Sequence, residues 1–107
     1  MMSDHFILKD KIPVPCDLMT WARWFDNAPH RVVAQDIIDV GGTRVSTVFL
    51  GIDHSFGEGP PLLFETTIFD LPKDHALEGY QERCSTWEEA EAQHLRAIDA
   101  LKRSESK

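Results

Sequence analysis

The residues with the clearest chemical potential lie in one loop near the middle of the chain. Segment 53–61 is polar and rich in Gly and Pro, and it separates two apolar runs that have the composition of β-strands. It places a carboxylate beside an imidazole, at Asp53 and His54. Such a pair can form half of a general-base arrangement or supply two metal ligands. Surface loops between rigid strands often carry the function of small domains.

The same loop offers an aromatic side chain and a glycine-rich turn. Phe56 adds apolar surface, and the run Gly57-Glu58-Gly59 could let backbone N–H groups approach an anion. Glu58 would repel a phosphate, however, and the spacing matches neither a P-loop nor a dinucleotide fingerprint. A long hairpin loop built from permissive turn residues is the simpler explanation of the run.

Glu65 is a carboxylate within a strand that is otherwise apolar or Thr. A buried carboxylate is costly unless it is paired, so a partner such as Arg31, Arg44 or His54 is expected. The alternative is that the sheet face is open at this position. If Glu65 folds back beside Asp53 and His54, the three side chains form a candidate site for a small molecule, a metal ion or a hydrolytic reaction.

The chemistry of the Asp-His pair has a simpler alternative. Asp53 can close a turn through its own side chain while His54 is solvated. The same dipeptide recurs at 4–5 and 74–75, where no site is expected. We therefore assign no catalytic residue, metal ligand or cofactor, and treat the loop as a binding surface. The candidate binding residues are Asp53, His54, Phe56, Gly57, Glu58, Glu65 and Trp24.

Trp24, Cys84 and His94 complete the set of residues with functional alternatives. Trp24 lies off the centre of an apolar helical stripe, so it either anchors a partner or packs at the stripe's margin. Cys84 precedes a helix N-terminus, where a thiolate is stabilised, although a structural cysteine is the simpler interpretation. His94 lies on the apolar stripe of the last helix and is expected to be packed there.

Composition narrows the function classes. The chain of 107 residues suits one domain, with residues 1–5 and 104–107 expected to be flexible. Its net charge is −7, which disfavours direct binding to nucleic acid or to an anionic membrane surface. The acidic surface serves solubility or attracts a basic protein partner. The two cysteines and the lack of a recognisable signal peptide predict reduced thiols and a cytoplasmic location.

Two helices and a set of strands are expected to position these residues. Asp17 is a plausible cap for a helix over 17–26, and overlapping capping boxes at 85–89 predict a second helix over 86–102. The stripe of the second helix contains Trp87, Ala90, His94, Ile98 and Leu101, with Leu95 beside it. Strands are predicted over 31–40, 43–52 and 62–69, a short fourth over 80–84, and an edge strand or arm at 6–8.

The Gly41-Gly42 pair predicts a two-residue hairpin turn. That turn would place Asp39 opposite Arg44 and Ile38 opposite Val45. Both faces of the resulting sheet are substantially apolar, which predicts helices on one face and a partner subunit, as in a homodimer, on the other. The fold class is therefore α+β: an antiparallel meander of three or four strands with an N-terminal and a C-terminal helix packed on it.

Several phrases of the sequence, read together, resemble a group of small, functionally uncharacterised proteins of bacteriophages and prophages. They are Pro13–Cys16 leading into Trp21–Phe25, Ser46–His54, Gly59–Thr66, and Ser85–Glu91 leading to His94. The resemblance spans about Pro13 to Leu101 and implies a phage-related source and the host cytoplasm. It lends no catalytic residues. The resulting prediction is a non-catalytic phage-type protein that binds or inhibits a host factor.

Overall fold

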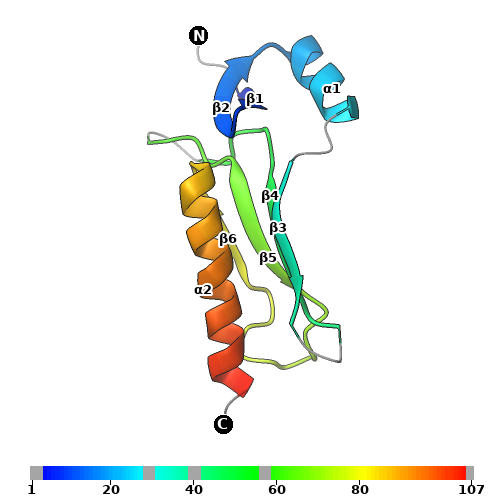
Figure 1. The fold of residues 1–107 in the computed structure, drawn as a ribbon, viewed down its shortest axis with the longest axis vertical. Coiled ribbons are helices and arrows are strands. Elements are labelled where there is room, and N and C mark those ends of the chain that lie inside the picture. The colour runs from blue at the N-terminus through cyan, green and yellow to red at the C-terminus, as the bar shows by residue number, and fades with distance from the viewer. Residues whose placement is uncertain (1–3, 28–30, 39–41, 56–58, 106–107) are drawn as a thin grey trace.

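The computed structural model describes residues 4–27, 31–38, 42–55 and 59–105, and this part of the chain forms two helices and six strands (Figure 1). Their order is β1 (His5–Lys9), β2 (Ile12–Cys16), α1 (Leu18–Asn27), β3 (Val32–Ile37), β4 (Arg44–Phe49), β5 (Phe64–Phe69), β6 (Gln81–Cys84) and α2 (Trp87–Glu105). The predicted α+β class, with antiparallel strands and a C-terminal helix on the sheet, is confirmed.

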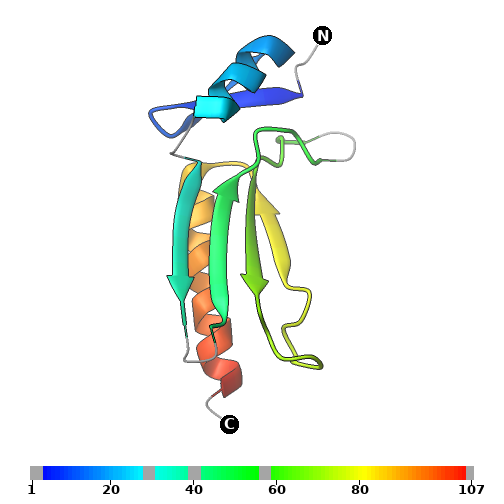
Figure 2. The ribbon, with the colours of Figure 1, turned by 90° about the vertical axis from the view of Figure 1, so that its right-hand side faces the viewer.

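The main sheet is an antiparallel meander in the order β3-β4-β5-β6. Helix α2 runs along one face of it, as Figure 2 shows. The opposite face is not covered by any described helix. The reciprocal bonds of the second capping box start α2: Thr86 Oγ1 accepts from Glu89 N at 3.1 Å, and Glu89 Oε1 accepts from Thr86 N at 3.1 Å.

A smaller hairpin lies at one end of this sheet. Strands β1 and β2 pair so that Lys9 faces Ile12, which leaves a two-residue turn at Asp10 and Lys11. Both turn residues have positive φ, 52° and 71°, as a type I′ turn requires. In this register Pro13 and Pro15 occupy the positions whose missing N–H would point away from β1. The prolines therefore cost no ladder hydrogen bond.

Gly51 joins the hairpin to the sheet. Its φ of +76° turns the chain out of β4, and its carbonyl accepts a hydrogen bond from Phe6 N at 2.8 Å. The predicted strand over 43–52 consequently ends at Phe49, and Ile52 bridges to His5 instead. Helix α1 begins with Thr20 N donating to Asp17 Oδ1 at 2.8 Å, as predicted.

Helix α1 was expected to lie beside the second helix over one sheet face. It instead packs on β1 and reaches the end of the sheet through aromatic side chains. The ring of Trp24 packs edge-to-face against two aromatic rings, with its centroid 5.0 Å from that of Phe25 and 5.7 Å from that of Phe49. The aromatic residues of α1 thus close the end of the core rather than its side.

The predicted register of the β3–β4 hairpin is wrong by two residues. Arg44 lies opposite Ile37, and Val45 lies opposite Asp36. Asp39, expected opposite Arg44, lies outside the described residues. Gly42 has φ +86°, as a hairpin glycine should, but Ile38 N donates to Thr43 O at 2.9 Å, so the predicted two-residue turn is not formed. Arg44 gains a different neighbour, with Cζ 4.8 Å from the ring centre of Phe69.

The core between α2 and the sheet consists of two apolar clusters. The first surrounds Phe49, Leu63 and Phe64, near the hairpin and α1. The second surrounds Val45, Ile68 and Leu101, toward the C-terminal end of α2. Between the two, the inward positions of β4 and β5 are Thr47 and Thr66, both fully buried. The core is therefore divided by a polar layer.

Candidate functional site

The central loop is held closed by Asp53. Its Oδ1 accepts hydrogen bonds from Ser55 N at 2.8 Å and from Leu62 N at 3.0 Å, which ties the two ends of the loop together. Burial raises the pKa of the Asp53 carboxyl, but these hydrogen bonds and the nearby His54 outweigh it and lower the pKa below its usual value. Asp53 therefore has the turn-closing role that was the alternative to a catalytic one.

Glu65 has partners of its own on the uncovered face of the sheet. Its Oε2 accepts from Arg83 Nε at 2.9 Å across the β5–β6 pair, and its Oε1 accepts from Thr67 Oγ1 at 3.3 Å. His54 makes its described contact through the backbone, with N donating to Leu62 O at 3.0 Å. The described contacts thus engage Asp53 and Glu65 separately.

Of the other predicted binding residues, one packs against the core and three lie in the part of the loop that the structure does not describe. Trp24 is half-buried in the aromatic cluster with Phe49. Phe56, Gly57 and Glu58 lie outside the described residues. Among the described residues, no group of three or more His, Cys, Asp and Glu side chains is placed to hold a metal ion.

The polar layer inside the core is the constellation that sequence reasoning missed. His94 Nδ1 lies 2.8 Å from Thr47 Oγ1, and His94 Nε2 lies 2.7 Å from Asp36 Oδ2. Thr47 Oγ1 lies 2.7 Å from Thr66 Oγ1, which donates to Gln93 Oε1 at 3.2 Å. His94 was expected to be packed on the helix, but not to bond two strands. The missed signal is the pair of threonines at inward strand positions facing a helix that carries Gln-His.

The layer resembles a carboxylate–imidazole–hydroxyl relay in its connectivity, but it is sealed. His94 is 3% exposed and Thr47 is 0% exposed, whereas Asp36 lies at the surface. A nucleophile must reach the substrate, so Thr47 cannot serve as one in this structure. The layer therefore acts as an internal polar tie that fixes α2 to β3, β4 and β5.

The hydrogen bonds of the polar layer can be completed in two ways. Three contacts, Thr47 with His94, Thr47 with Thr66, and Thr66 with Gln93, require three protons, and the two hydroxyls supply two. With Gln93 Oε1 accepting, the third proton comes from His94 Nδ1. With the Gln93 amide rotated, its NH₂ supplies the third proton and His94 Nδ1 accepts.

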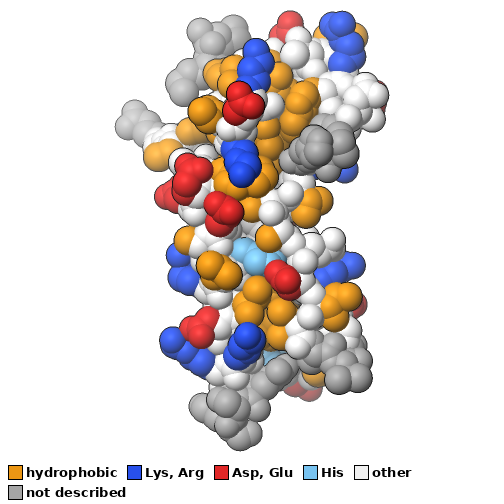
Figure 3. Space-filling model, in the orientation of Figure 1, with side chains coloured by type: hydrophobic (Ala, Val, Ile, Leu, Met, Phe, Trp, Pro, Cys, Tyr) orange, Lys and Arg blue, Asp and Glu red, His pale blue; other side chains and the backbone are white. Residues whose placement is uncertain are grey.

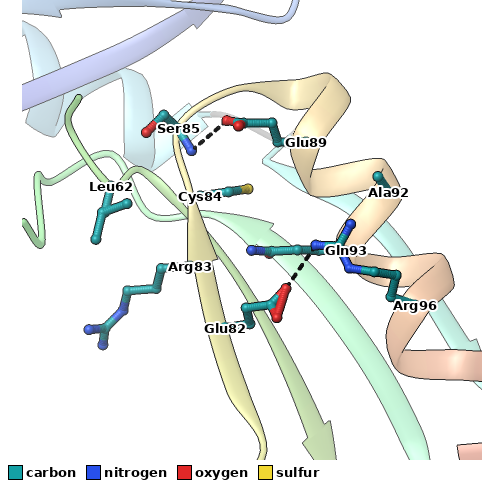
Figure 4. Close-up of a pocket in the computed structure, with 9 residues that line it drawn as sticks. All are labelled: Leu62, Glu82, Arg83, Cys84, Ser85, Glu89, Ala92, Gln93 and Arg96. Atoms are coloured by element: carbon teal, nitrogen blue, oxygen red, sulfur yellow. Dashed lines mark hydrogen bonds and ion pairs between the residues drawn. The ribbon is translucent and has the colours of Figure 1, made fainter. Parts of the chain in front are cut away.

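A hollow of about 450 Å³ lies where β6 meets α2 (Figure 4). Its charged groups are already engaged, since Arg96 pairs with Glu82 at 3.0 Å and Glu89 accepts from Ser85 N at 3.2 Å. Cys84 also lines it, and burial, followed by the charge of Glu89, raises the pKa of this thiol to about 11. A thiol with that pKa stays protonated near neutrality, so the hollow holds no activated nucleophile.

The uncovered sheet face presents three cross-strand rows. The first is Val32, Val48, Glu65 and Arg83; the second is Gln35, Ser46, Thr67 and Gln81; the third is Ile37, Arg44 and Phe69. Ile37 is 72% exposed and Phe69 is 40% exposed. The face thus has apolar residues at its two ends and a polar middle. The prediction of two substantially apolar faces is wrong here, because Arg44, Ser46, Glu65 and Thr67 all point away from α2.

Compared with known protein families, curated proteins and solved structures, the chain matches no family model, no curated protein and no solved structure. Neither described helix is long and apolar enough to span a membrane.

Proposed function

We propose that this chain is a non-catalytic protein-binding domain whose contact surface is the uncovered face of its four-stranded sheet. The observation that supports this is the difference in burial between the two faces of the sheet. One face carries α2 and the whole core, while the other carries exposed Ile37, Phe69 and Val32 around a polar centre.

The composition of this face suits protein recognition. Phe69 carries Arg44 over its ring, and aromatic residues and arginine are both enriched at protein interfaces. Glu65 and Arg83 form a pair at 2.9 Å that can be shared with a partner's polar groups. A sheet face with a polar middle row, and with both apolar and charged side chains in its end rows, offers area and hydrogen bonds to a protein partner.

Three groups that could have supported catalysis have structural roles instead. Asp53 closes its loop, Glu65 is paired with Arg83, and the hydroxyl of Thr47 is sealed inside the core. These engagements favour binding over the small-molecule, metal-binding or hydrolytic alternative. The net charge of −7 would steer a basic partner toward the domain over a long range.

From the phage-like phrases of the sequence we extend the proposal to its setting. The partner would be a host protein, met in the cytoplasm of the infected cell. The described residues of the central loop, 53–55 and 59–61, adjoin the end of the sheet, and the loop would add to the contact.

Affinity capture from a bacterial lysate tests the proposal. Phe69→Ser removes the aromatic residue from the uncovered face, and Met19→Ser is the matched control, because Met19 is 64% exposed on α1. We expect one or more proteins to be retained by the wild-type chain and by Met19→Ser and to be lost with Phe69→Ser. Identical captured sets for all three chains would refute the uncovered face as the contact surface.

A further inference from the structure

The outer edge of β3 has no described strand paired with it. In antiparallel pairs, hydrogen-bonded and non-hydrogen-bonded residues alternate. The bond from Ile38 N to Thr43 O places Asp36 and Ala34 in the bonded positions toward β4. The backbone N–H and C=O groups of Gln35 and Ile37 therefore point away from β4, and no described strand pairs with them.

The other edges of the described sheets are protected by familiar devices. On β2, Pro13 and Pro15 remove the outward donors. The outer edge of β1 is occupied by the bond from Phe6 N to Gly51 O. Strand β6 is four residues long and carries the charges of Glu82 and Arg83.

Strand β3 has no proline and no described covering bond at its edge, although its register with β4 shifts between Val32 and Ala34, so the regular part of this edge is 34–37. The strand is six residues long, contains no Lys or Arg, and carries Ile37 with 72% of its surface exposed. Its single charge, Asp36, points toward α2 and contacts His94. A strand with this composition at an open edge is a template for pairing.

We propose that this edge binds a second copy of the chain, with β3 pairing antiparallel to β3 of the copy across a two-fold axis and joining two sheets of four strands into one. Because the outward groups belong to Gln35 and Ile37, only a few registers keep the hydrogen bonds. A register centred on Asp36 would oppose two like charges and is disfavoured. Centring on Gln35 places it opposite its own copy, so that this register opposes two neutral side chains.

The surface beside this edge also suits a second copy. Ile38, which directly follows β3, and Ile98 on α2 are half-buried against the second apolar cluster, and Leu95, one turn before Ile98 on α2, is 67% exposed. Figure 3 shows hydrophobic side chains gathered along the seam between α2 and β3. Two paired strands alone bury less than the roughly 1,200 Å² of a stable interface, so these residues would add needed area. The dimer should accordingly be concentration-dependent.

Sedimentation equilibrium over a range of concentrations tests the pairing. We expect the wild-type chain to shift with concentration from its 12.2 kDa monomer toward twice that mass. Gln35→Pro removes an outward donor from each copy without touching the β4 ladder and should weaken the dimer about tenfold or more. The matched control, Met19→Ser, should dimerise as the wild-type chain does.

A charge exchange tests the register. Gln35→Glu and Gln35→Lys should each be monomeric, because each opposes like charges at the two-fold axis, and an equimolar mixture of the two should regain the dimer. A wild-type chain that stays monomeric at every concentration would overturn the proposal. So would a dimer that none of the Gln35 substitutions weakens, or a charge pair that fails to associate. Because Phe69→Ser leaves β3 intact, loss of captured partners and loss of the dimer are separate outcomes.

Discussion

Replacing Thr47 by Val tests whether the polar layer holds α2 on the sheet. The substitution nearly keeps the shape of the side chain but removes a fully buried hydroxyl that contacts Thr66 at 2.7 Å and His94 at 2.8 Å. Each lost hydrogen bond costs about 1 kcal/mol net, and a buried nitrogen of His94 is left without a partner. We expect the free energy of unfolding to fall by about 2–3 kcal/mol.

Urea unfolding followed by far-UV circular dichroism measures this change. Thr67→Val is the matched control, because Thr67 lies on the neighbouring strand but faces the uncovered side, where water can replace its 3.3 Å bond to Glu65. We expect the control to stay within about 0.5 kcal/mol of the wild-type chain. In thermal unfolding, Thr47→Val should lower Tm by about 8–24 °C, since each kcal/mol shifts a domain of this size by roughly 4–8 °C.

Equal and small effects of Thr47→Val and Thr67→Val would refute the reasoning, because burial would then not distinguish the two hydroxyls. Adding Thr66→Val provides a second check. Thr47 and Thr66 share one hydrogen bond, so the double variant should lose less stability than the sum of the two single variants. Strict additivity would mean that the two hydroxyls do not interact.

Three further predictions follow from the fold. Gly51→Ala should cost about 2–4 kcal/mol in urea unfolding, because the residue has φ +76° and its new Cβ would collide with the ring of Phe25; a cost below 1 kcal/mol would contradict that packing. The pKa of Asp53 is lowered in the folded protein, so this carboxylate stabilises the fold above about pH 4, and the stabilisation is lost as the pH falls through the pKa of the folded state. Asp53→Ala should therefore make the free energy of unfolding fall less steeply in acid. An unchanged dependence of stability on acid pH would contradict this role. Cys84, with a pKa of about 11, should react with iodoacetamide in the native state more slowly than half-buried Cys16; faster labelling of Cys84 would show that it is not buried.

Local features of the chain could be predicted because their causes lie within a few residues. The caps at Asp17 and Thr86 bind backbone N–H groups three residues away, so their side chains were sufficient evidence for where each helix begins. Strands β4, β5 and β6 could be predicted because each is a short apolar or β-branched run bounded by turn residues. The α+β class needed only the order of these elements.

The register of the β3–β4 hairpin could not be predicted from its turn residues alone. Gly42 takes the positive φ that a tight turn needs, but the pairing of Ile37 with Arg44 shows that the loop is longer. Arg44 then stacks on Phe69, a residue 25 positions away. Pairing across strands is set by the sum of such contacts, and the two-residue turn was only one candidate.

The amino-acid sequence by itself determined the two helices and the strands of the main sheet, and it marked the loop around Asp53 as polar and rich in turn residues, but it did not predict the β1–β2 hairpin. Only the tertiary structure decided that Asp53 closes this loop, that Glu65 pairs with Arg83, and that Thr47 meets His94 inside the core. The physical reason is separation along the chain. Thr47 and His94 are 47 residues apart, and no local preference of either one records that α2 will cross β4 at that point. The same holds for the bare edge of β3, since a strand becomes an edge only when the whole sheet has formed.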